Sequence, residues 1–313
     1  MIPSKEVVLA AYKRVRPFVH QTPVLTSTLL NNLVEAKLYF KCENFQKMGA
    51  FKMRGAINAI QQLSETQKEA GVVTHSSGNF AQALSLAAKN LGVKAYIVMP
   101  SNAPKVKKEA VKEYGGIITE SQPTLDDRER EANQIQKETG ATFIHPSNNI
   151  DVILGQGTAA IELIKKHSDL DYILTPVGGG GLIAGTALAA HYLSPTCKVF
   201  GGEPLKADDA WRSLQTGKIE TNEMANTVAD GLRTNLGDQN FPIINKLVLE
   251  IIRVEETEII AAMRLIWERM KVIVEPSSAV PLAAVLKKQT FFSNKKIGII
   301  ISGGNVDLKN LPF

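Results

Sequence analysis

Short apolar runs rich in β-branched residues alternate with amphipathic segments along the chain. Strands are predicted at 71–74, 95–99 and 116–119, and helices follow at 80–91, 104–114 and 125–139. A second series begins later, with strands at 172–177, 198–200 and 297–301. One of its helices is predicted to begin at 182, and two more are predicted at 256–271 and 277–288. Because strands that alternate with helices form parallel sheets, the pattern predicts an α/β fold with two lobes.

Composition narrows the class of protein. The 313 residues are 44% hydrophobic and 21% charged, a balance typical of soluble globular proteins. The net charge of +5 comes from basic residues interleaved with acidic ones, which does not favour a nucleic-acid partner. Two cysteines without a CxxC motif indicate neither a disulfide framework nor a zinc site. Neither a secretory signal nor an apolar run of ~18 residues is present, so a cytoplasmic protein without membrane insertion is expected.

Lys52 lies where a loop passes into a helical pattern that extends to position 63. The dipole at the start of a helix disfavours a positive charge and so eases deprotonation of the lysine amine. A neutral amine forms an imine with an aldehyde, which makes Lys52 a candidate catalytic residue. Most lysines beside a turn are only solvated, and this stretch alone favours that interpretation.

The segment Ser76–Asn79, with the sequence Ser-Ser-Gly-Asn, connects a predicted strand to a predicted helix. Free amide and hydroxyl groups at such a turn form an anion site suited to an amino-acid carboxylate. Serine and asparagine are also favoured as helix N-caps, so an ordinary turn stays equally open.

Four consecutive glycines, Gly178–Gly181, are the strongest local motif. Between a strand and a helix they let backbone amides approach a phosphate closely. Gly179, Gly181 and Ala184 also form a degenerate G-x-G-x-x-A, with Glu203 about twenty residues further on, as in a dinucleotide fold. Another strand-end loop carries Ser302, whose hydroxyl can contact a buried ligand or simply belong to a glycine turn.

Together these motifs resemble the fold-type II pyridoxal-phosphate enzymes, specifically serine/threonine dehydratases and eukaryotic-type serine racemases, over essentially the whole chain. The resemblance implies a two-lobed fold like that of the tryptophan synthase β subunit. The large cofactor-binding domain would comprise 1–61 and 149–313, and the small domain 62–148. Lys52 would bind pyridoxal 5′-phosphate as a Schiff base. The other implied cofactor-binding residues are Phe51, Asn79, Gly178, Gly179, Gly180, Gly181, Leu182, Gly231, Glu275 and Ser302.

The resemblance also implies a reaction on a small hydroxy amino acid. Lys52 would remove the Cα proton, and Ser77 would be the acid/base on the opposite ring face in a racemase. Ser302 would face the ring nitrogen with a neutral hydroxyl, which suits elimination of a β-hydroxyl. The implied substrate-binding residues are Ser76, Ser77, Gly78, Asn79, Arg128 and Thr234.

Glu203, Ala207 and Asp209 match the divalent-cation loop of the same family. Two carboxylates and a carbonyl supply hard oxygen ligands for Mg²⁺, or for Ca²⁺ or Mn²⁺. Without the resemblance, a solvated acidic turn is the preferred interpretation.

The chain departs from the family pattern at two positions. Ala50 stands where many relatives have serine, and Phe80 replaces the histidine of the usual Ser-Gly-Asn-His. A phenyl ring favours contact with an apolar group such as the threonine methyl. Arg128 favours a different substrate, because it can attract a second carboxylate, as in 3-hydroxyaspartate. A solvated helix face is an equally good account of Arg128.

The expected activity is dehydration and deamination of L-threonine or L-serine to 2-oxobutyrate or pyruvate and ammonia. With the chain ending at Phe313, the short catabolic type without a regulatory domain is expected. Serine racemase and threo-3-hydroxyaspartate dehydratase are the alternatives. A dinucleotide-dependent oxidoreductase and a non-catalytic amino-acid binding module are disfavoured by the joint presence of the four motifs. A homodimer is the implied assembly.

Overall fold

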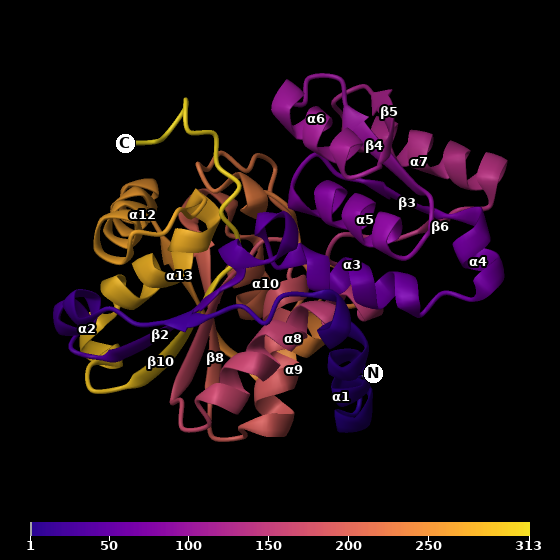
Figure 1. Cartoon of the computed structure of the whole chain (residues 1–313). Helices are drawn as coiled ribbons and strands as arrows, with labels where there is room; N and C mark the ends of the chain where they lie inside the picture. Colours follow the sequence, from indigo (N-terminus) through magenta and orange to yellow (C-terminus); the bar gives the residue numbers. More distant parts are fainter. Residues whose placement is uncertain (1) are drawn as a thin grey trace.

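The computed structural model describes residues 2–313, which form two sheets of mainly parallel strands (Figure 1). The larger sheet has six strands in the order β1-β2-β10-β7-β8-β9, and only the β1–β2 pairing within it is antiparallel. These strands are β1 (Val24–Leu25), β2 (Lys37–Cys42), β10 (Lys296–Ile301), β7 (Tyr172–Pro176), β8 (Lys198–Pro204) and β9 (Val248–Val254). Helices cover both of its faces, as buried parallel strands require.

One face of the larger sheet packs on helices that share a hydrophobic core: α1 (Lys5–Val15), α8 (Ile150–Lys166), α9 (Gly181–Leu193) and α11 (Phe241–Leu247). The other face packs on α2 (Thr28–Val34), α12 (Glu256–Met270), α13 (Pro276–Lys287) and α14 (Gln289–Phe292). The short helix α10 (Asp209–Thr216) follows β8. No helix among residues 2–313 is both long enough and apolar enough to cross a membrane.

The smaller sheet is entirely parallel, with the strand order β5-β4-β3-β6, and lies at the upper right of Figure 1. Its strands are β3 (Val72–His75), β4 (Ala95–Pro100), β5 (Ile117–Ser121) and β6 (Thr142–Phe143). The helices α4 (Glu65–Ala70), α5 (Asn79–Asn90), α6 (Lys105–Glu113) and α7 (Leu125–Thr139) accompany these strands, and α3 (Lys52–Gln61) precedes them. The predicted α/β fold with parallel sheets is confirmed.

Helix α3 links the two cores. Its apolar residues Met53, Ile57 and Ile60 are buried in the core of the smaller sheet. Its other side packs so closely on α8 that a Cβ on Gly55 would lie 2.9 Å from Val152 Cγ1. All strands of the smaller sheet fall within 62–148, and we propose this range as the small domain, with 1–61 and 149–313 as the large one.

Most predicted elements coincide with observed ones within a few residues, and α7 has the predicted bounds. The hydrophobic pattern did not reveal β2, β9, α1 and α8. Helix α8 is buried on nearly all sides, so it lacks the polar stripe that marks an amphipathic helix. Strand β2 ends in the buried pair Lys41 and Cys42, and the lysine interrupts its apolar run.

Candidate active site

The loop after β10 holds the start of α3 in place. Phe51, the N-cap of α3, donates its backbone N–H to the Ser302 carbonyl at 3.0 Å. An isolated antiparallel bridge pairs Ala50 with Gly303 beside it. Lys52, the first residue of α3, is thereby held next to the Ser302 loop, although the two lie at opposite ends of the sequence.

The amine of Lys52 lies in a largely apolar setting. Its Nζ donates to the Pro146 carbonyl at 2.9 Å and lies 5.1 and 5.8 Å from the ring centroids of Phe51 and Phe80. Burial lowers the pKa of Lys52 to about 8, and the negative charge of Glu275 opposes the shift. A larger fraction of neutral amine is therefore available for imine formation and proton transfer than for an exposed lysine.

The buried Glu275 and the half-buried Asn79 form a polar pair beside Lys52. Asn79 Nδ2 donates to both carboxylate oxygens of Glu275, at 3.0 and 3.1 Å. Burial raises the pKa of Glu275 to about 7, although the hydrogen bond from Asn79 lowers it. The backbone of Gly303 passes so near that a Cβ there would lie 2.9 Å from Glu275 Oε1.

Asn305 orients Asn79 and was not predicted as a site residue. Its Nδ2 donates to Asn79 Oδ1 at 2.9 Å and to the Met48 carbonyl at 2.8 Å. The Ser-Gly-Gly-Asn sequence around Ser302 was the available signal, because Asn305 closes the same loop.

The glycine-rich loop between β7 and α9 presents free backbone donors. Within the described chain, the N–H groups of Gly178 to Leu182 have no hydrogen-bond acceptor. They surround the N-terminus of the 13-residue helix α9, where the helix dipole favours negative charge. Gly180 has a φ of +78°, which disfavours any residue with a side chain. The loop can therefore bind a phosphate group.

Close packing places further predicted residues around this loop. A Cβ on Gly178 would lie 2.8 Å from Leu232 Cα and 3.1 Å from the Gly231 carbonyl oxygen, and one on Gly179 would lie 3.0 Å from Thr234 Oγ1. Gly231 in turn donates its N–H to Ser277 Oγ at 3.1 Å. The structure thus brings Gly231 and Thr234 to the glycine-rich loop.

Two residues that support the loop were missed by sequence reasoning. Asn240 Nδ2 donates to the carbonyls of Gly179, at 2.9 Å, and Ser147, at 3.3 Å. Gln156 donates Nε2 to the Pro146 carbonyl at 3.2 Å, while its buried Oε1 has no partner among the described residues. These side chains come from α8 and from the turn before α11, and no local motif marks them.

Ser302 is buried and its hydroxyl lies 2.9 Å from that of Ser278 on α13. Ser278 Oγ also accepts from the Gly303 N–H at 2.7 Å. The Ser302 hydroxyl is therefore held by α13, the helix whose N-cap is Glu275. Ser302 is thus not an ordinary turn residue.

Ser76, Ser77 and Gly78 lie in the loop between β3 and α5, next to Asn79. Ser76 Oγ accepts a 3.4 Å hydrogen bond from Gly78 N–H, whereas the Ser77 hydroxyl has no partner in the described chain. Arg128 is half-buried on α7 and donates Nε to the Thr124 carbonyl at 3.3 Å. It forms no ion pair with any carboxylate of residues 2–313, and its charge helps to lower the pKa of His75, second to burial.

The three predicted metal ligands lie together at the end of β8. Glu203 and Asp209 are fully buried, and Ala207 is buried between them. Glu203 accepts backbone N–H groups from Ala210 and Trp211, at 2.9 and 2.8 Å. Burial first, and the neighbouring carboxylate second, raise the pKa of Glu203; burial raises the pKa of Asp209 to about 6. No cluster of three His, Cys, Asp or Glu side chains suited to a metal occurs in residues 2–313.

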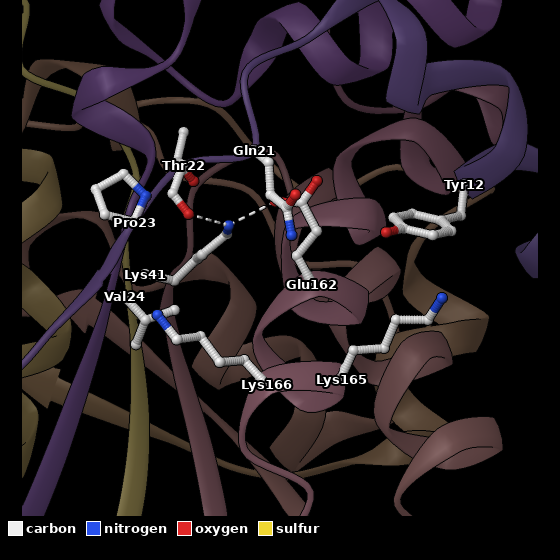
Figure 2. A pocket seen from close by; sticks show the side chains of 9 residues that line it. All are labelled: Tyr12, Gln21, Thr22, Pro23, Val24, Lys41, Glu162, Lys165 and Lys166. Atoms are coloured by element: carbon white, nitrogen blue, oxygen red, sulfur yellow. Dashed lines mark hydrogen bonds and ion pairs between the residues drawn. The ribbon is translucent and has the colours of Figure 1, made fainter.

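A buried ion cluster under α3 was not predicted. Arg54 contacts Glu43 at 2.7 Å and Glu162 at 2.8 Å, and Lys41 contacts Glu162 at 2.5 Å. Figure 2 shows Lys41 reaching Glu162 and the Thr22 carbonyl in a pocket of 280 Å³, which Tyr12, Lys165 and Lys166 also line. None of the predicted site residues lines this pocket. Because Arg54 lies on α3, the cluster anchors the helix that begins at Lys52.

Comparison with known proteins defines the class. Residues 15–303 match the family described as pyridoxal-phosphate dependent enzyme. The match covers most of the chain and agrees with the two parallel sheets flanked by helices. The chain therefore belongs to the fold-type II pyridoxal-phosphate-dependent enzymes, as the sequence resemblance implied.

Relatives within the family narrow the comparison. The chain is 47% identical over 312 residues to beta-hydroxyaspartate dehydratase from Paracoccus denitrificans, with 100% of this chain and 99% of that protein covered. It is 52% identical over 307 residues to serine racemase from Dictyostelium discoideum, with 96% and 94% covered. The crystal structure of a T.th. threonine deaminase matches with a TM-score of 0.93 and 43% identity, covering 98% of this chain and 99% of the other.

These relatives change the balance between the predicted activities. They support the two alternatives, serine racemase and hydroxyaspartate dehydratase, better than the expected threonine/serine ammonia-lyase. Phe80 favoured threonine, but its ring is only 2% exposed and belongs to the core of the smaller sheet. Its replacement of histidine is therefore also a packing feature, which weakens the inference about the substrate.

The residues present fit pyridoxal phosphate. Free N–H groups at the start of α9 suit the phosphate, the Lys52 amine has a lowered pKa, and the ring of Phe51 lies beside it. Asn79, Glu275 and Ser302 supply polar groups around the same space. When bound, the cofactor withdraws electrons from the Cα of an amino acid joined to it.

Proposed function

We propose that this enzyme removes water from 3-hydroxyaspartate and that hydrolysis of the resulting imine then gives oxaloacetate and ammonia. The half-buried guanidinium of Arg128, which forms no ion pair among residues 2–313, carries the proposal. Its helix α7 packs on β3, which ends at His75, directly before the Ser76–Asn79 loop. A desolvated arginine without a carboxylate partner is suited to the second carboxylate of a dicarboxylic substrate. The Paracoccus relative, named a beta-hydroxyaspartate dehydratase, supports the same substrate class.

The chain's own groups have separate tasks in this proposal. The N–H groups and hydroxyls of Ser76–Asn79 bind the α-carboxylate. The backbone N–H groups of Gly178–Leu182 would bind the cofactor phosphate. Lys52 would hold the cofactor, and its amine would take the Cα proton of the substrate. The Asn79–Glu275 pair would contact the edge of the cofactor ring, and the Ser302 hydroxyl, which Ser278 holds, would serve the ring nitrogen. Loss of the β-hydroxyl and hydrolytic release of ammonia complete the reaction.

Serine racemisation is a second candidate, favoured by Ser77. Its hydroxyl has no intramolecular partner among the described residues, so it is free to exchange a proton with a bound amino acid. A base on one face and an acid on the other are needed to invert Cα, and Lys52 and Ser77 are the candidates for these roles. The Dictyostelium relative is named a serine racemase.

A substrate panel with matched arginine variants tests the proposal. Cofactor-loaded protein is incubated separately with L-threo-3-hydroxyaspartate, L-threonine and L-serine, and 2-oxo acids and D-serine are measured. Arg128→Met is expected to lower kcat/KM for hydroxyaspartate about 10- to 100-fold, because a charge-assisted contact is worth about 1.5–3 kcal/mol. It should leave turnover of threonine within about threefold. Arg130→Met is the control, since Arg130 is exposed on the same helix and pairs with Asp127.

Three results would count against the proposal. Equal losses for all three substrates would assign Arg128 a structural role. D-serine as the dominant product of the wild type, with little oxaloacetate, would favour the racemase. Dominant 2-oxobutyrate would restore the threonine interpretation.

We also propose a divalent cation at Glu203, Ala207 and Asp209, and a homodimer. Neither buried carboxylate forms an ion pair with a Lys or Arg of residues 2–313, so a cation would offset their mutual repulsion. EDTA should lower the melting temperature and Mg²⁺ should restore it, whereas Asp209→Asn should abolish both responses. A melting temperature that ignores EDTA and Mg²⁺ would reject the site. Light scattering of the purified protein measures the assembly.

A further inference from the structure

The segment His145–Asn149 joins the smaller sheet to the larger one and touches both parts of the proposed cofactor site. It runs from the end of β6 to Asn149, the N-cap of α8. The Pro146 carbonyl accepts from Lys52 Nζ at 2.9 Å. Ser147 packs against the glycine-rich loop, because a Cβ on Gly179 would lie 2.3 Å from Ser147 Oγ. Any shift of this segment therefore moves the acceptor of the lysine and the wall of the phosphate loop together.

The imidazole of His145 holds this segment in shape. Its Nδ1 lies 2.8 Å from the backbone nitrogen of Asn148 and 3.2 Å from that of Ser147, and both nitrogens donate. A ring nitrogen that accepts two N–H groups carries no proton, so the tautomer has its hydrogen on Nε2. The two bonds close a tight turn around Pro146, whose own nitrogen has no hydrogen to contribute.

The surroundings keep this ring neutral. Burial first, then the charges of His75 and Lys52, lower the pKa of His145 to about 4, and Asp238 opposes the shift. His75 lies on β3 with its ring centroid 6.1 Å away, and Phe143 packs on β6 at 6.3 Å. The acceptor at Nδ1 is therefore retained across the neutral pH range.

We propose that His145 is a positioning residue of the cofactor site: its Nδ1 acceptor fixes Pro146 on the Lys52 amine and Ser147 on the glycine-rich loop. Among the described residues, the His145 ring itself forms no hydrogen bond with Lys52 or with Gly178–Gly181. The inference rests on the proposed assignment of Lys52 and Gly178–Gly181 to the cofactor.

The tautomer is tested first, in the protein without cofactor. Nitrogen-15 NMR of histidine-labelled protein at pH 7, assigned with His145→Asn, should show an unprotonated Nδ1 and a protonated Nε2 for His145. A proton on Nδ1 would overturn the proposal whatever the enzyme does, because Nδ1 could then accept neither N–H group.

Cofactor binding tests the consequence. Asparagine places Oδ1 at the same number of bonds from the backbone as Nδ1, whereas glutamine moves its oxygen one bond further. His145→Asn should therefore bind pyridoxal phosphate within about threefold of wild type, and His145→Gln about tenfold more weakly, by absorbance titration. His75→Asn is the control and should also stay within about threefold, because no hydrogen bond joins the His75 ring to the segment among the described residues.

The pattern across variants decides between outcomes. Equal weakening in His145→Asn and His145→Gln would show that ring packing matters and the acceptor does not, which overturns the proposal. Wild-type affinity in all three variants overturns it too. If the wild type itself binds no pyridoxal phosphate, the proposed cofactor assignment fails, and the NMR result still reports on the turn.

Discussion

Replacing Arg54 with methionine tests how strongly the buried ion cluster anchors α3. Arg54 is fully buried, and its guanidinium makes four hydrogen bonds to the carboxylates of Glu43 and Glu162, at 2.7–2.9 Å. It also donates to Thr158 Oγ1 at 3.2 Å. Methionine fills a similar part of the space but carries no charge. Lys41 is then the cation that remains for the buried carboxylates of Glu43 and Glu162.

The loss in free energy of unfolding expected for Arg54→Met follows from the burial of Glu43 and Glu162. Removing one member of a buried ion pair costs about 3–5 kcal/mol, because the other charge stays desolvated and unpaired. A free energy of unfolding of about 5–15 kcal/mol is typical of folded proteins, so the loss is a large share of it. For a chain of this size each kcal/mol lowers Tm by about 2 °C, which gives a fall of about 6–10 °C.

The stability deficit of Arg54→Met should depend on pH in a definite direction. Burial alone would raise the pKa of Glu43, but the charge and hydrogen bonds of Arg54 outweigh it, so the pKa lies below 4.5 in the folded protein. A depressed pKa contributes stability above the unfolded pKa of about 4.3 that is lost as pH falls through the folded value. In Arg54→Met that contribution disappears, and burial instead raises the pKa of Glu43, so ionisation of its carboxyl opposes folding increasingly as the pH rises above about 4.3. The deficit should therefore be largest near pH 7.5 and shrink as the pH falls toward 4.

Urea unfolding followed by circular dichroism at pH 7.5 and pH 5 measures the effect. Arg264→Met is the matched control, because Arg264 is exposed and its pair with Glu268 is 3.9 Å long, so it should change stability by less than about 0.5 kcal/mol. A deficit below about 1 kcal/mol for Arg54→Met, or one that grows at low pH, would refute the reasoning.

Three further predictions concern the candidate site. Borohydride reduction of the cofactor-loaded protein should label Lys52, and peptide mapping that finds the label on another lysine would reject it as the Schiff-base residue. Gly180→Ala should weaken pyridoxal-phosphate binding at least about tenfold, because φ is +78° and the new Cβ would lie 2.6 Å from Leu236 Cδ2; unchanged affinity in an absorbance titration would contradict this. Because the pKa of Glu275 is raised to about 7, its ionisation opposes folding, so the stability of the cofactor-free protein should fall as pH rises from about 4.5 to 7. Glu275→Gln should remove that slope in melting experiments, and an identical slope in both proteins would show that another group is responsible.

Local sequence was sufficient for the class of fold and the motifs of the site. Alternating strands and helices predicted parallel sheets, and the loops that carry Ser76, Gly178 and Ser302 all follow strands. Loops that follow parallel strands of one sheet lie at the same edge of it, as those after β7 and β10 do, so the Gly178 and Ser302 loops could be recognised as candidate binding loops without a structure. The run Gly178–Gly181 directly before a predicted helix was sufficient to indicate a phosphate-binding loop.

Contacts between distant segments were decided by the tertiary structure. Lys41 and Glu162 lie 121 positions apart and meet because α8 packs on one face of the sheet that contains β2. Asn305, Asn240 and His145 likewise act through partners on other elements, and each looks like an ordinary loop residue in the sequence. A side chain's hydrogen-bond partners and desolvation depend on which elements surround it. Those neighbours are set by the order of the strands, which no local pattern of residues encodes.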